Sequence, residues 1–364
     1  MKINQITKLI EEFAPLSLQE DYDNAGLLIG NADDEVNAAL LCIDVSEKII
    51  DEAITKKCNL IISHHPLIFK GLKSITGKNE TERCVLKAIK NNIAIYTAHT
   101  NIDNAEHGVS FKMAEKIGLK NTQILLPQAE KLLKLVTFVP NDKADEVRQA
   151  IFEGGGGAIG NYDMCSYNLH GEGTFRALEG TNPYVGNVGE MHTEAEMRIE
   201  VILPNYLKNS VLSKLIKVHP YEEPVVDFYV LQNAYPKVGS GLVGELENEV
   251  DEIVFLQKLK EIFAVPCIKH SPLTGKRIKK VALCGGSGSF LINNAIASQA
   301  DIFITGDVKY HDYFLAENRI LIADIGHFES EQYTKEIFFE IIRKKFSTFA
   351  VHFSEIEKNQ INYL

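Results

Sequence analysis

The chain has 364 residues, of which 45% are hydrophobic and 24% are charged, an ordinary balance for a globular protein. Its net charge of -11, from 38 basic and 49 acidic residues, argues against a general nucleic-acid-binding or anionic-membrane surface. A chain of this length exceeds the usual size of one compact core, so two domains are expected.

The N-terminal residues predict a helix rather than a targeting segment. Ile3, Ile6, Ile10 and Phe13 recur at helical intervals, and charges interrupt the segment, so it is neither a signal peptide nor a membrane span. No other run reaches the roughly 18 apolar residues that a span needs. The six cysteines are far apart, which disfavours disulfides and zinc knuckles. We expect a cytoplasmic protein with no membrane partner.

The first third of the chain alternates short apolar runs with amphipathic segments. The predicted strands are 38–44, 60–63 and 93–97, and the predicted helices are 46–56, 80–90 and 109–117. This alternation indicates a largely parallel sheet covered by helices.

The middle of the chain has a different pattern. Residues 133–139 and 197–203 alternate apolar and polar side chains, as half-exposed antiparallel strands do. With helices at 143–152 and 206–218, the order β-α-β-β-α-β predicts a ferredoxin-like α+β domain. We expect residues 129–234 to be an insertion between two parts of one α/β domain, 1–128 and 235–364, with linkers near Gln128 and Asn233–Pro236.

The last third returns to the α/β pattern of the first. The predicted strands are 280–283, 301–305, 320–324 and 348–352, and the predicted helices include 290–299 and 331–346.

Two adjacent histidines, His64 and His65, follow the apolar run 60–63. Neighbouring residues on a strand point to opposite faces, but Pro66 forces the chain out of the sheet directly afterwards. Both rings can then turn toward one cavity and serve two adjacent metal ions.

Three more polar segments follow predicted strands, at 96–103, 305–312 and 324–331. Ligands of open α/β sheets bind beyond the carboxyl ends of the strands. His327 and Glu331 are spaced i, i+4, which places them on one face of a helix. Singly, an Asp or Glu after a strand is usually a helix cap. As a set, the predicted metal ligands are His64, His65, Asp103, His327 and Glu331.

This donor set predicts two divalent ions. Imidazole suits zinc, iron and nickel, and a carboxylate can bridge two cations. Zinc or iron is favoured by ligand type, and manganese and nickel remain open. Three neutral histidines and two carboxylates around two divalent ions leave a surplus of positive charge, which would lower the pKa of water held between the ions.

Further polar residues accompany these ligands. His99 could orient a ligand or shuttle a proton, or could have only a structural hydrogen bond. Asp307, with Tyr310 and His311, could line the opening of the predicted metal site, and Asp307 is a candidate general base. Their alternative is a capped turn before a helix. The segment 284–289, Cys-Gly-Gly-Ser-Gly-Ser, could hold a phosphate on its amides or form a tight turn.

Five segments together resemble the Nif-three-like family, whose members are often labelled GTP cyclohydrolase 1 type 2 homologues. They are Asn24-Ala-Gly-Leu-Leu-Ile-Gly30, Ser63-His-His-Pro-Leu-Ile-Phe69, Ala98-His-Thr-Asn-Ile-Asp103, Thr305-Gly-Asp307 and Gly326-His-Phe-Glu-Ser-Glu331. The resemblance implies a two-lobed α/β metalloprotein fold and dinuclear ligands at the same five positions, with Glu331 as the bridge. It also implies a homohexamer.

The middle segment His219-Pro-Tyr-Glu-Glu-Pro-Val-Val-Asp227 is similar to the CutA signature, which implies a PII/CutA-like insertion. From all of this we expect a dinuclear metal-dependent hydrolase with Glu331, His99 and Asp307 as catalytic residues. Its substrate would be a small molecule, and the resemblance implies a purine nucleotide whose ring is opened by metal-activated water. The alternative is a non-catalytic metal-binding or metabolite-sensing scaffold.

Overall fold

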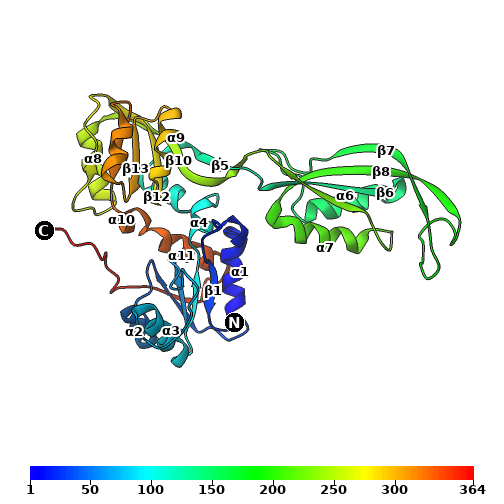
Figure 1. The fold of residues 1–364 in the computed structure, drawn as a ribbon, viewed down its shortest axis with the longest axis horizontal. Helices are drawn as coiled ribbons and strands as arrows, with labels where there is room; N and C mark the ends of the chain where they lie inside the picture. Colours follow the sequence, from blue (N-terminus) through cyan, green and yellow to red (C-terminus); the bar gives the residue numbers. More distant parts are fainter. The chain divides into compact units, whose positions relative to one another are not determined.

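The computed structural model describes all 364 residues, which pack as two compact units (Figure 1). Unit 1 combines both ends of the chain, Met1–Pro127 and Pro236–Leu364, and unit 2 is the intervening segment Gln128–Tyr235. Unit 1 contains two sheets and unit 2 contains one. No helix is both long and apolar enough to cross a membrane.

The first sheet of unit 1 has the strand order β1-β4-β3-β2-β15. Its strands are β1 (Gly26–Ile29), β2 (Ala38–Cys42), β3 (Leu60–Ser63), β4 (Ala94–Thr97) and β15 (Ala350–Phe353). The pairs β15–β2, β2–β3 and β3–β4 are parallel, and β1 pairs antiparallel with β4. The strands β2, β3 and β4 are buried throughout, which explains their continuous apolar sequences.

Helices around this sheet come from both ends of the chain. They are α1 (Ile3–Phe13), η1 (Leu16–Leu18), α2 (Glu47–Thr55), α3 (Glu80–Lys90), α4 (Thr100–Asn104) and α11 (Thr334–Lys345). The helix α5 (Val109–Ile117) instead packs against the second sheet. The helices α2 and α3 pack on one face of the sheet, whereas α11 contacts both α1 and β2. Asn79 is the N-cap of α3, since its side chain accepts a hydrogen bond from the Glu82 amide.

The second sheet has the order β11-β14-β13-β12-β10-β5. Its strands are β5 (Lys120–Gln128), β10 (Tyr235–Asp251), β11 (Lys269–His270), β12 (Arg277–Ser287), β13 (Ile302–Gly306) and β14 (Leu321–Asp324). Its helices are α8 (Glu252–Ile262), η4 (Ser289–Leu291), α9 (Ile292–Ala297), η5 (Tyr310–Ala316) and α10 (His327–Glu331). The strands β12, β13 and β14 are parallel, and β10 pairs antiparallel with β12.

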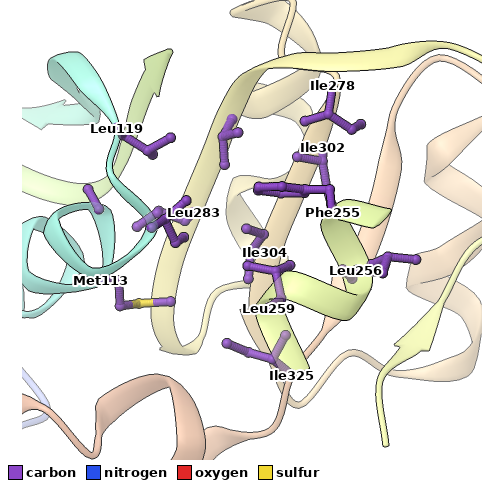
Figure 2. Close-up of a cluster of buried hydrophobic side chains, with 14 of the residues drawn as sticks. Met113, Leu119, Phe255, Leu256, Leu259, Ile278, Leu283, Ile302, Ile304 and Ile325 are labelled. Carbon is purple, nitrogen blue, oxygen red and sulfur yellow. The ribbon is translucent and has the colours of Figure 1, made fainter. Parts of the chain in front are cut away.

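Alternate residues of these strands supply two cores, one on each face of the second sheet. Figure 2 shows Phe255 and Leu259 of α8 beside Ile302 and Ile304 of β13. Phe303, between those two isoleucines, packs in the other core with α9 residues. The sheet is therefore covered on both faces, and its free carboxyl ends are where a site can form.

Unit 2 is a four-stranded antiparallel sheet with the order β7-β8-β6-β9. Its elements are β6 (Leu132–Pro140), η2 (Asn141–Lys143), α6 (Ala144–Glu153), β7 (Tyr167–Arg176), β8 (Met191–Pro204), η3 (Asn205–Leu207), α7 (Lys208–Val218) and β9 (Val226–Leu231). This β-α-β-β-α-β order is the ferredoxin-like topology expected from the sequence. Both helices pack on one face of the sheet.

Some predicted boundaries are wrong. The helix predicted over 331–346 begins only at Thr334, as α11, and the separate short helix α10 ends at Glu331 before it. Gln332 and Tyr333, between them, hydrogen-bond the carbonyls of Phe263 and Ile262 at the end of α8, which accounts for the change of direction. The helix predicted over 290–299 is a 3₁₀ turn followed by the short α9. The segments predicted as linkers contain the end of β5 and the beginning of β10, and the two boundaries of unit 2 lie there.

Candidate metal centre

Histidines and carboxylates from both sheets of unit 1 meet at the carboxyl ends of their strands. His64 and His65 directly follow β3, and His99 follows β4 and precedes α4. His327 and Glu331 are the first and last residues of α10, which follows β14. The rings of His65 and His327 lie 5.2 Å apart although they come from different sheets.

All four histidines are oriented in the same way. Each ring has its Nδ1 atom within hydrogen-bond distance of an oxygen outside the cluster, so that Nδ1 can donate to that oxygen and Nε2 is left for partners within the cluster. The pairs are His64 with the Ala98 carbonyl at 3.0 Å, His65 with Asp44 at 2.8 Å, His99 with Asp23 at 2.7 Å and His327 with Asp307 at 2.7 Å. The Nε2 atoms of His65 and His327 face each other at 3.3 Å.

Glu331 lies between these histidines and is almost fully buried. Its Oε1 is 3.5 Å from His64 Nε2, and its Oε2 is 2.9 Å from His65 Nε2 and 3.2 Å from His327 Nε2. Asp103 Oδ1 approaches His64 Nε2 to 3.7 Å. The two oxygens of Glu331 therefore belong to two different groups of donors.

Neighbouring carboxylates favour the protonated forms of His65 and His327. Burial opposes protonation of His65, but hydrogen bonds to Asp44 and Glu331 outweigh it and raise its pKa to about 10. Burial likewise opposes protonation of His327, but Glu331 and Asp307 raise its pKa to about 9.

The pKa values of the more deeply buried groups, His64, Asp103 and Glu331, are shifted in other directions. Burial lowers the pKa of His64. Burial and the charge of Glu331 raise the pKa of Asp103 well above its usual range. Burial also opposes ionisation of Glu331, yet His64 and the other histidines hold its pKa well below the usual range. Of the two central carboxyl groups, the surroundings thus favour ionisation of Glu331 over ionisation of Asp103.

The donor set fits divalent metal ions. Three groups of side chains bring their ligand atoms within 4.8 Å of one another: His64, Asp103 and Glu331; His65, His327 and Glu331; and His64, His65 and His99. The buried atoms His64 Nε2 and Asp103 Oδ1 have no hydrogen-bond partner. A divalent cation would satisfy both atoms and allow both carboxyl groups to ionise, which hydrogen bonds within the protein do not achieve.

The glycine-rich turn at the end of β12 accommodates Glu331. A Cβ atom on Gly286 would lie 2.2 Å from Glu331 Oε1. The amide of Gly286 donates to Ser330 Oγ, and that of Gly288 donates to Thr305 Oγ1, each at 2.9 Å. These amides are used within the protein, so the structure favours the tight turn over the phosphate cradle for this segment.

The structure brings together all five predicted ligands, together with His99 and Asp307. Tyr310 and His311 instead form an exposed aromatic cluster with Phe314 on η5. Sequence reasoning missed Asp44, which holds His65, and Asp23, which holds His99. Asp44 is the last residue of the predicted strand 38–44, at its carboxyl end, so the rule that found the other segments could have found it.

Unit 1 is thus an α/β protein with a centre of histidines and carboxylates that could hold metal ions. The sequence of the whole chain matches the family model Duf34/NIF3 (NGG1p interacting factor 3) over residues 1–360. The chain belongs to this family.

Relatives and a solved structure resemble the whole chain. It is 40% identical over 324 residues to a GTP cyclohydrolase 1 type 2 homolog of Halalkalibacterium halodurans, covering 88% of this chain and 87% of the relative. The homolog of Bacillus subtilis is 34% identical over 369 residues, with 99% and 98% covered. The crystal structure of a Bacillus cereus protein related to NIF3 superposes with a TM-score of 0.86 at 36% identity, covering 100% and 99%.

Proposed function

We propose that this chain is a dinuclear metal-dependent hydrolase. In this proposal His64 and Asp103 hold one ion, His65 and His327 hold the other, and Glu331 bridges the two. The observation that carries it is that the two carboxylate oxygens of Glu331 face different histidines. Its Oε1 faces His64, whereas its Oε2 faces His65 and His327. Nitrogen and carboxylate donors favour zinc or iron, and they also accept manganese or nickel.

Two bound divalent ions would acidify water and polarise a carbonyl or phosphoryl oxygen of a substrate. The residues of the chain complete the site. His99, fixed by Asp23, directs its Nε2 toward the other histidines and can give or accept a proton there. Asp307 contacts His327 rather than the centre of the site, so we propose that it acts by orienting that ring.

The substrate class rests on the relatives. Their name, GTP cyclohydrolase 1 type 2 homolog, supports water-dependent opening of a purine nucleotide with release of formate. The same donor set would also suit phosphoester or amide hydrolysis. We further propose a cytoplasmic homohexamer, on the family resemblance.

The test is formate release from GTP by protein loaded separately with zinc, manganese and iron, with Glu331→Gln as the control. We expect two metal ions per chain and metal-dependent turnover that the variant lacks. Full metal content without formate release would overturn the cyclohydrolase chemistry. Fewer than two ions in the wild-type chain, measured by elemental analysis, would overturn the dinuclear centre.

A second candidate is a non-catalytic metal-binding scaffold that senses a metabolite. It is supported by a cavity that lies wholly within unit 2 and includes none of the metal-centre residues. A scaffold would lose no function in Glu331→Gln as long as it kept its oligomer. Size-exclusion chromatography of that variant, beside the formate assay, therefore separates the two candidates.

A further inference from the structure

Unit 2 contains a cavity of about 690 Å³ on the sheet face that its helices leave open. Ile199 and Val201 of β8 pack against the helices, whereas Glu196 and Arg198 line the cavity. Because alternate residues of a strand point to opposite faces, the cavity lies on the face away from α6 and α7. Its volume is in the range of small-molecule sites.

Aromatic rings gather around Tyr221 in this cavity. The Tyr221 ring centre lies 6.3 Å from that of Phe175 and 6.4 Å from that of Tyr184, and both pairs are tilted by 56°. A fourth lining ring, Phe138, already has the guanidinium of Arg198 over its face at 5.7 Å. The unit thus already places one cation on an aromatic face within this cavity.

The charged residues of the lining are mainly acidic. Glu196 is 9% exposed, and its Oε1 accepts a hydrogen bond from the Tyr221 hydroxyl at 2.6 Å. Gly173 makes room for this carboxylate, since a Cβ there would lie 2.2 Å from Glu196 Oε2. Glu172, Glu222 and Glu223 also line the cavity. Against these four carboxylates stand only Arg176 and Arg198, and Arg198 is paired with Glu200 at 2.8 Å.

The segment 219–227 builds much of this wall. Tyr221, Glu222 and Glu223 belong to it, and Glu222 accepts a hydrogen bond from the Asn182 amide at 3.0 Å, tying the loop between β7 and β8 to the wall. His219 is buried beneath them: its Nε2 donates to the Phe138 carbonyl at 3.1 Å, and its Nδ1 accepts from the Tyr221 amide at 3.2 Å. His219 therefore positions Tyr221.

We propose that this cavity binds a small organic cation of the alkylated-ammonium type. Such a cation is weakly hydrated, so it can leave water for the faces of Tyr221, Tyr184 and Phe175, while the carboxylate of Glu196 balances its charge. The site is independent of the metal centre and of the chemistry proposed there.

The experiment is saturation-transfer NMR on the full-length chain with choline as the probe and neohexyl alcohol, its uncharged carbon analogue, as the comparison. We expect saturable choline binding at least about tenfold tighter than that of the alcohol, the size of a desolvated cation–π contribution. Equal binding of the two probes would overturn the proposal, because the cavity would then select for shape alone. Absence of choline binding would overturn it as well, including when a second copy of the chain covers the cavity.

Two variants locate the binding. Glu196→Gln keeps an acceptor for the Tyr221 hydroxyl and removes only the charge, and Tyr184→Leu removes one ring at a half-exposed position. Each should weaken choline binding several-fold and leave the alcohol unchanged. The matched control is Tyr162→Leu, an exposed tyrosine of the same unit that does not line the cavity. If all three variants bind choline like the wild type, the cation lies elsewhere.

Discussion

Contacts of single atoms set the orientation of the side chains in the candidate metal centre. The Nδ1 atom of each of its four histidines lies within hydrogen-bond distance of an oxygen outside the cluster, and this contact fixes the orientation of the ring. Small residues matter equally, because the buried carboxylate of Glu331 occupies space that any side chain at Gly286 would fill.

Gly286→Ala should therefore reduce the metal content of the purified chain toward none. The new Cβ would lie 2.2 Å from Glu331 Oε1, at a backbone φ of +61° that L residues rarely adopt. Gly118→Ala is the control, since its φ is +87° and no atom lies within 4 Å of the new Cβ. It should cost about 1 kcal/mol of stability and retain the metal. Equal metal loss in both variants would contradict a specific role for Gly286.

His219 makes the stability of unit 2 depend on pH. Burial lowers its pKa, opposed only by its hydrogen bond to Phe138, so the unfolded chain binds a proton more readily than the folded one. This contribution is complete above the unfolded pKa of about 6.5 and is lost as the pH falls toward the lowered folded value. Hydrogen exchange of β6 amides, corrected for intrinsic rates, should show reduced protection at pH about 5. His219→Gln should weaken that dependence; an unchanged pH profile in this variant would assign the effect to other groups.

At the scale of elements, the C-terminal segment supports the metal centre from outside. The last strand, β15, pairs with β2. Beyond it, Glu357 accepts hydrogen bonds from the amides of Ile43 at 2.5 Å and Asp44 at 3.0 Å and pairs with Lys335 at 2.6 Å. Since Asp44 orients His65, a residue near the end of the chain helps to place a histidine near its beginning.

Glu357→Ala should weaken metal binding by about 10-fold or more without unfolding the chain, as the loss of partners that orient ligands commonly does. The measurement is competition with a chromophoric chelator, which reports the affinity of each ion. Glu355→Ala is the control, because Glu355 is exposed and pairs only with Lys56. If both variants keep wild-type affinity, the tail has no part in placing Asp44.

Elements with a simple apolar pattern could be predicted from the sequence, and those set by distant partners could not. The buried strands β3 and β13 and the helix α5 were predictable from short apolar runs and periodicity. The break between α10 and α11 was not, because it depends on the carbonyls at the end of α8. The candidate ligands could be found because strand ends share one edge, whereas the contact between Glu357 and Asp44 leaves no local pattern.

For the whole molecule, the position of the insertion predicts that unit 1 can fold without it. The strands β5 and β10, which flank unit 2, are neighbours in the second sheet. Replacing residues 129–234 by a short turn would therefore join two adjacent strands.

That deletion variant should remain folded and keep its full metal content, measured by circular dichroism and elemental analysis. No metal-centre residue lies in unit 2, so no ligand would be lost. A deletion variant that folds but binds no metal would show that unit 2 contributes to the centre.

The candidate metal centre combines residues from distant parts of the chain, and this sets the order in which its donors appear during synthesis. His65 and His327, whose Nε2 atoms lie 3.3 Å apart, are separated by 262 positions in the chain. At about 5–20 residues per second, a ribosome makes the second histidine roughly 13 to 52 seconds after the first. Throughout that interval the nascent chain presents an incomplete donor set. The proposed centre can therefore be completed only after His327 has been made, and the first sheet likewise waits for β15, its last strand in chain order.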